Sequence, residues 1–122
     1  MLTPKQVVGK EIENLASSYL QQHGLKLITT NYSCKSGEVD LIMSDGENLV
    51  FVEVRYREGF SYGDGVSTIN KNKQNRIIKA AVYYLQKHNL YDRVLCRFDI
   101  VAVSGKNKND LLWIKDAFWA RW

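Results

Sequence analysis

Two apolar runs joined by a hairpin signal, each with an acidic residue among its apolar residues, constrain the fold of this chain more than any other feature. Residues 38–43 and 48–57 have the composition of β-strands, and the Asp-Gly pair between them is typical of a tight turn. In the second run three valines alternate with Glu53 and Arg55, so the two sets are predicted to face opposite sides of a sheet. The chain therefore contains a β-hairpin with one apolar face and one partly charged face.

The rest of the chain supplies two helices and further strands. Thr3 and Gln6 form a capping box that begins the first helix, Pro4 suits its first position, and Gly24 is placed to end it. This order predicts an α/β fold with an αβββαβ core, in which a mixed sheet is flanked by helices and the second helix crosses between parallel strands. The expected ranges are a helix to about residue 23, strands at 25–32, 38–43 and 48–57, a loop at 58–65, a helix at 68–88, and strands at 93–103 and 111–115.

Length and composition exclude several classes of protein. A chain of 122 residues buries about two-thirds of its unfolded surface, which suffices for one core. We expect a single domain over residues 1–122, with its core at about 4–103 and a C-terminal strand and aromatic tail at 111–122. No apolar run approaches the length of about 20 residues needed to cross a bilayer, and the N-terminus lacks the apolar segment of a signal peptide.

Cysteine content and charge indicate the compartment and the class of partner. Two cysteines, Cys34 and Cys96, are too few for a disulfide scaffold and match no metal-ligand spacing, so we expect free thiols in the cytoplasm. Seventeen basic against thirteen acidic residues give a net charge of +4. That charge indicates either a mildly basic surface or, if the basic residues cluster near a site, a nucleic-acid partner.

Two carboxylates lie inside the apolar strands. Burying Asp40 and Glu53 without a partner would cost several kcal/mol, so such residues are normally paired or bound to a metal. If the strands pair through the predicted turn, Asp40 can lie beside Glu53 on the face that also carries Arg55. Mg²⁺ or Mn²⁺ would relieve the repulsion between the carboxylates and keep positions open for a phosphate. The alternative is that Glu53 and Arg55 form ion pairs on a solvated sheet face.

The helices carry further candidates. Glu11 and Glu13 lie beyond opposite edges of the apolar stripe of the first helix, and a helical wheel does not choose between them as a third carboxylate. The N-terminal half of the second helix concentrates basic residues that suit phosphate groups, although a solvated charged face is the alternative. Gln74 faces inward, where it needs a partner such as a water, a base or a backbone carbonyl. The basic residues are Lys71, Lys73, Arg76 and Lys79.

With these residues in place, the chain resembles the YraN family, small bacterial proteins of largely unassigned function. That family is similar to the PD-(D/E)xK restriction-endonuclease-like superfamily and to Holliday junction resolvases. The resemblance runs from about residue 8 to residue 103. The matching segments are Glu13-x-x-Ala16-x-x-Tyr19-Leu20, Asn31-Tyr32, Gly37-Glu38-Val39-Asp40-Leu41, Leu49 to Arg55, Lys71 to Arg76 and Arg97-Phe98-Asp99.

The resemblance implies roles for individual residues. It makes Asp40 and Glu53 the metal ligands, with the carbonyl of Val54 able to contribute, and it selects Glu13 rather than Glu11 as the third carboxylate. Mg²⁺ or Mn²⁺ is the implied cofactor.

One residue departs from the superfamily pattern. Arg55 occupies the place of a lysine that can help to activate the attacking water, whereas arginine stays protonated in proteins. Gln74 and Lys71 fall where superfamily members place polar residues facing the site. Arg57 and the basic residues of the second helix are the expected contacts with nucleic acid.

The resemblance implies a metal-dependent endonuclease that acts on DNA, including branched or recombining DNA, with RNA left open. One alternative, motivated by Arg55, is a nucleic-acid-binding module that has lost efficient turnover. Another is an accessory subunit of a DNA-processing enzyme, motivated by Phe118, Trp119 and Trp122 in the tail. A homodimer is plausible because cutting both strands of a duplex usually needs two sites.

Overall fold

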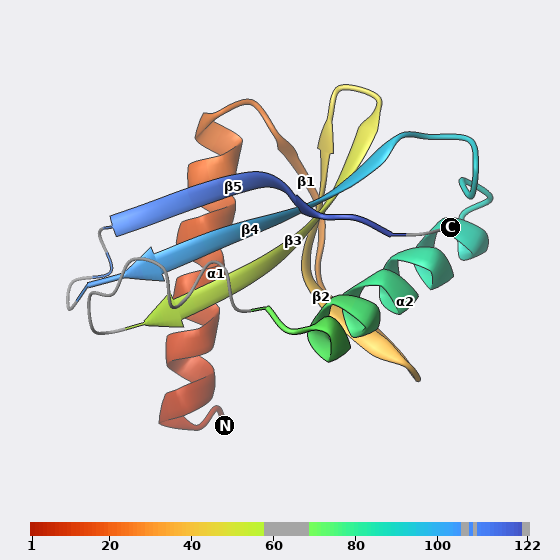
Figure 1. The fold of residues 1–122 in the computed structure, drawn as a ribbon. Coiled ribbons are helices and arrows are strands. Elements are labelled where there is room, and N and C mark those ends of the chain that lie inside the picture. The colour runs from red at the N-terminus through yellow and green to blue at the C-terminus, as the bar shows by residue number, and fades with distance from the viewer. Residues whose placement is uncertain (58–68, 106–107, 109, 121–122) are drawn as a thin grey trace.

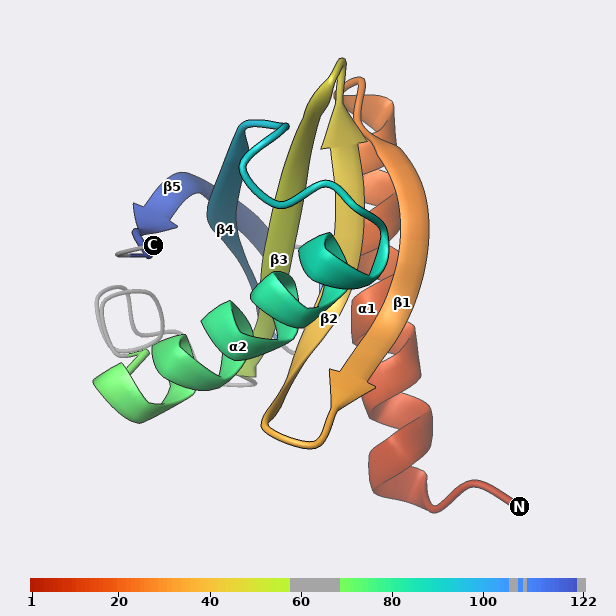
Figure 2. The same cartoon turned by 90° about the vertical axis from the view of Figure 1, so that its right-hand side faces the viewer.

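The computed structural model describes residues 1–57, 69–105, 108 and 110–120, and it shows one mixed β-sheet with a helix on each face (Figures 1 and 2). The predicted α/β fold with an αβββαβ core is therefore confirmed. The loop predicted at 58–65 and Trp122 lie outside the described residues. The elements are α1 (Pro4–Gln22), β1 (Lys26–Cys34), β2 (Gly37–Asp45), β3 (Asn48–Arg57), α2 (Lys71–Lys87), β4 (Cys96–Ser104) and β5 (Asp110–Phe118).

The strands lie in chain order across the sheet, from β1 at one edge to β5 at the other. The predicted hairpin joins β2 and β3 in antiparallel register, with Asp45 opposite Asn48. Among the described strands, β3 and β4 form the single parallel pair, and α2 is the crossover that connects them. The middle of the sheet is thus covered on both faces.

Each helix packs on its own face of the sheet. On one face Ile12 and Leu20 of α1 join Val50 and Val52 of β3 in a buried cluster. On the other face the predicted apolar stripe of α2 packs against Phe51 of β3. Because side chains alternate along a strand, Glu53 lies on the same face as Phe51, which is the face that α2 covers. The buried residues of the α2 stripe are Ile77, Ala80, Ala81, Tyr84 and Leu85.

The bounds of α1 and β3 agree with local sequence signals, whereas the bounds of the other elements differ from the predicted ranges by one to three residues. The Thr3 side chain accepts the N–H of Gln6 in the predicted capping box, and Gly24 follows α1 with a φ of 98°. Helix α2 begins three residues later than predicted, after its N-cap Asn70. Strand β4 begins at residue 96 because 91–93 form a turn, and β5 extends to residue 118. No helix in the described ranges combines the length and apolar character needed to cross a membrane.

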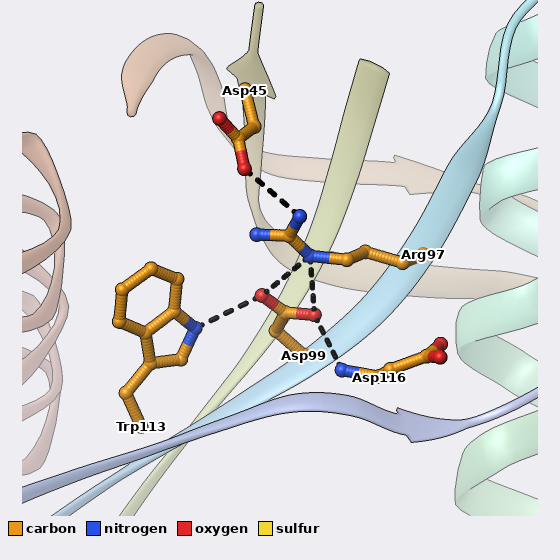
Figure 3. Close-up of polar contacts among 5 residues, drawn as sticks. All are labelled: Asp45, Arg97, Asp99, Trp113 and Asp116. Atoms are coloured by element: carbon orange, nitrogen blue, oxygen red, sulfur yellow. Dashed lines mark hydrogen bonds and ion pairs between the residues drawn. The ribbon is translucent and has the colours of Figure 1, made fainter. Parts of the chain in front are cut away.

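A buried carboxylate fixes β5 to β4 (Figure 3). Asp99 is fully buried, and both of its oxygens accept hydrogen bonds from Nε of Arg97, at 3.1 and 3.2 Å. Its oxygens also accept the indole N–H of Trp113 and the backbone N–H of Asp116, each at 2.9 Å. Arg97 reaches on to Asp45 at 2.9 Å. The backbone of Asp116 has a φ of 56° at a shift in the β4–β5 register, so Asp99 supplies the acceptor that the regular ladder lacks there.

Candidate functional site

The candidate site lies toward the end of the sheet that carries the β1–β2 turn, where β2 and β3 separate (Figure 2). The ladder between these strands ends at Leu41 and Val52, one residue short of Asp40. The side chains of β2 also change from one face of the sheet to the other there. Val39 belongs to the buried cluster that includes α2, whereas Leu41 belongs to the buried cluster that includes α1. The Asp40 carboxylate takes the place of a strand partner and accepts the N–H of Val54 at 2.8 Å. Asp40 is therefore held against the open edge of β3.

Glu53 lies beside Asp40, as the hairpin pattern predicted, and it is only 5% exposed. Burial raises the pKa of Glu53 to about 8, and the charge of Asp40 and a side-chain hydrogen bond with Asp40 add to the rise. The positive charges of Lys73 and Arg55 lower this pKa without cancelling the effect of burial. Burial and the neighbouring Asp40 charge therefore favour the protonated form of Glu53.

Lys73 enters the site from the first turn of α2. The side chain of Asn70 accepts the backbone N–H of Lys73 at 2.8 Å and so caps the helix. The Lys73 ammonium lies 3.6 Å from a Glu53 carboxylate oxygen and 3.9 Å from an oxygen of Glu38. Arg76, one turn further along α2, pairs with the same Glu38 oxygen at 3.7 Å. Lys73, predicted only as a nucleic-acid contact, thus lies between two carboxylates of the site.

Glu13 and Glu11, which the helical wheel did not separate, have different surroundings. The Glu13 carboxylate accepts a hydrogen bond from the Asn31 side chain at 2.9 Å. Burial raises the pKa of Glu13, the Asn31 hydrogen bond opposes the rise, and the charge of Asp40 adds to it. Glu11 instead pairs with Lys108 at 3.3 Å. Glu13 is therefore the helix carboxylate that faces Asp40.

The remaining predicted residues surround this centre at different depths. The Gln74 side chain donates to the backbone carbonyl of Ile69 at 2.9 Å, so it bonds to the chain itself rather than to Asp40 or Glu53. Arg55 is half-buried, and its charge acts on Glu53. The other predicted nucleic-acid contacts are exposed, and they are Arg57, Lys71, Arg76 and Lys79.

The chemistry of the donors fits a divalent cation bound together with substrate. In the part of the chain that the structure describes, no three His, Cys, Asp or Glu residues are grouped so as to hold a metal by themselves. Mg²⁺, however, commonly uses one or two carboxylates and completes its shell with waters and a phosphate. Asp40 and Glu53 supply that pair. The N–H of Val54 points to Asp40, and a strand residue directs its C=O to the same edge as its N–H, so the Val54 carbonyl faces this side too.

Sequence reasoning missed Glu38 and Asn31 as members of the site. Asn31 lies opposite Asp40 in the β1–β2 register, its φ is 50°, and its side chain donates to Glu13 of α1. That irregularity has no clear signal in a single sequence. Glu38 could have been suspected, because it lies two residues before Asp40 in the same strand.

Comparison with known proteins places this sequence among bacterial relatives. A profile of "Uncharacterised protein family UPF0102" matches residues 12–103. A UPF0102 protein of Coxiella burnetii is 47% identical over 117 residues, covering 96% of each chain. One from Nitrosococcus oceani is 47% identical over 111 residues, covering 90% of each chain. A third, from Legionella pneumophila, is 44% identical over 110 residues, which is 90% of this chain and 92% of the relative.

Proposed function

This chain belongs to the uncharacterised family UPF0102, and we propose that it is a divalent-metal-dependent endonuclease that hydrolyses DNA phosphodiester bonds. The proposal uses the resemblance of its motifs to the PD-(D/E)xK nucleases as well as the geometry of the site. Branched or recombining DNA is the substrate that this resemblance favours.

The observation that carries the proposal is the pairing of Asp40 with a buried Glu53. Burial raises the pKa of Glu53 to about 8. Burying a carboxylate in this way costs free energy of folding, which is unusual for a residue with a purely structural role. Strongly perturbed acids next to a specific charge partner are concentrated at functional sites. Cations flank the pair, which suits an anionic substrate: Lys73 and Arg55 act on Glu53, and exposed basic residues continue along α2.

In this proposal the residues of the chain bind the substrate phosphate, orient the carboxylates and accept a proton from the attacking water. The Val54 N–H fixes Asp40, and Lys73 and Arg55 stabilise the negative charge that develops on the phosphate. Arg55 stays protonated and cannot act as a base, so a carboxylate of the pair would take the proton of the attacking water as its oxygen bonds to phosphorus. The P–O bond to the leaving strand would then break, and the leaving oxygen would take a proton from solvent. A bound Mg²⁺ or Mn²⁺ supplies Lewis-acid polarisation of the scissile phosphate.

Cleavage assays test the proposal with Mg²⁺ or Mn²⁺ and single-stranded, duplex, flap and four-way-junction DNA. We expect metal-dependent cutting by the wild type and a loss of at least about 100-fold in Asp40→Asn and Glu53→Gln, because both remove charge at the reacting centre. Glu11→Gln is the matched control, since Glu11 pairs with Lys108 instead. Equal cutting by wild type and Glu53→Gln contradicts the proposal.

A non-catalytic nucleic-acid-binding module is the second candidate, and Arg55 favours it. If this candidate is correct, wild-type protein binds DNA without cutting it, and Arg55→Lys gains activity in the same assay. An accessory role for a DNA-processing partner is a third reading. It is favoured by Trp119, which is 74% exposed, whereas Phe118 stacks on Phe98 in the core.

A further inference from the structure

We propose that Gly37 is a positioning residue: its missing side chain lets α2 lie close enough to β2 for Lys73 to reach Glu53. The effect of this contact on cleavage rests on the proposed function, whereas the contact is a property of the fold that can be measured without any activity.

The first support is steric. Gly37 is buried at the start of β2, and a Cβ built on it would lie 1.9 Å from the backbone oxygen of Arg76 and 2.7 Å from its carbonyl carbon. Real Cβ atoms essentially never approach within 3.0 Å of such a neighbour, so α2 and β2 would have to separate by about 1 Å or more. The obstructing atoms are helix backbone and cannot turn aside as the end of a side chain can. Glycine is therefore required for this packing distance.

The second support is electrostatic. Glu38, the next residue of β2, pairs with both Lys73 and Arg76 of α2. Lys73 and Arg76 are three positions apart in the sequence, so their side chains lie on the same side of the helix. Gly37 and Glu38 thus hold one side of α2 against the sheet, by close contact and by charge.

The close approach at Gly37 determines the position of Lys73. Its ammonium is 3.6 Å from the Glu53 carboxylate, so a displacement of about 1 Å moves the pair beyond ion-pair contact. Lys73 is one turn before Arg76 in the same helix and moves with it. The steric fit at Gly37 therefore sets the position of a charge in the candidate site.

A double-mutant cycle, measured by urea unfolding at pH 9, above the raised pKa of Glu53, tests this proposal. Lys73→Met, Glu53→Gln and the double variant are compared in the wild-type and Gly37→Ala backgrounds. We expect a favourable coupling between Lys73 and Glu53 in the wild type and its loss in Gly37→Ala. Equal coupling in the two backgrounds overturns the proposal.

A matched background controls for general loss of stability. Gly24→Ala strains a residue with a φ of 98° but meets no atom within 4 Å, so the coupling should persist there. If Gly37→Ala does not fold, NMR of the wild-type protein tests the close approach instead. An NOE from the Gly37 α protons to the Arg76 α proton supports the close approach, and the absence of this NOE overturns it. If the wild-type protein does not cleave DNA, the proposed nuclease function is wrong. The double-mutant cycle still tests the role of Gly37 in that case.

Discussion

Replacing Asp99 with alanine is expected to destabilise the protein by about 3–5 kcal/mol, the typical effect of removing one partner from a buried ion pair. Asp99 is fully buried and accepts hydrogen bonds from Nε of Arg97, the Trp113 indole N–H and the backbone N–H of Asp116. Without it Nε of Arg97, the Trp113 indole N–H and the Asp116 N–H lose their common buried acceptor, and the C-terminal half of β5 keeps only its pairing and ring stacking at Phe118 with β4. Chemical denaturation followed by circular dichroism measures the change.

Asp45→Ala is the matched control for this prediction. Asp45 bonds to the same arginine, but its side chain is 44% exposed, so its loss should cost about 1 kcal/mol or less. Trp113→Phe, which keeps an aromatic ring but removes the indole N–H, should fall between the two. The interpretation of Asp99 as the structural link is wrong if Asp99→Ala and Asp45→Ala are equally stable.

The substitution Glu53→Gln is expected to stabilise the metal-free protein at pH 8 by about 4 kcal/mol, or on the order of 15 °C in Tm. The pKa of Glu53 is raised in the folded state from its ordinary 4.5 to about 8. As the pH rises through that window, the unfolded chain gives up a proton that the folded protein keeps, so stability falls with increasing pH. Glutamine has no charge to bury and removes this loss.

Melting curves from pH 5 to pH 8 measure the effect. Wild type should lose stability relative to Glu53→Gln as the pH rises, and the two should nearly coincide at pH 5. Glu11→Gln, on an exposed helix surface, should follow the wild type throughout. A difference between wild type and Glu53→Gln that does not vary with pH is the result that contradicts a raised pKa.

Much of the fold could be predicted because its signals are local. The capping box of α1, the hairpin turn after Asp45 and the alternation of β3 each depend on a few neighbouring residues, and each is confirmed. The extent of β5 was underestimated, because its last residues are held by Asp99 from another strand. The start of β4 was placed too early, since its apolar character begins before the backbone leaves the preceding turn.

The candidate site also has one part that local sequence signals predicted and another part that they did not. The adjacency of Asp40 and Glu53 follows from the hairpin register, so sequence alone predicted it. The place of Lys73 depends instead on how closely α2 approaches β2, and the pairing of Glu13 with Asn31 depends on a backbone irregularity in β1. These are tertiary distances, which no periodicity in the sequence encodes.

Calorimetric titration of metal-free protein with Mn²⁺ tests the central claim, that Asp40 and Glu53 form a divalent-cation site, most directly. Wild type, Asp40→Asn and Glu53→Gln are compared, with Glu11→Gln as the control that keeps the same net charge as the other two variants. We predict saturable binding by wild type and Glu11→Gln, and a loss of at least about tenfold in affinity in the two site variants, because each removes one of the anionic oxygen ligands that hard cations require. Binding of equal strength in all four proteins contradicts the assignment.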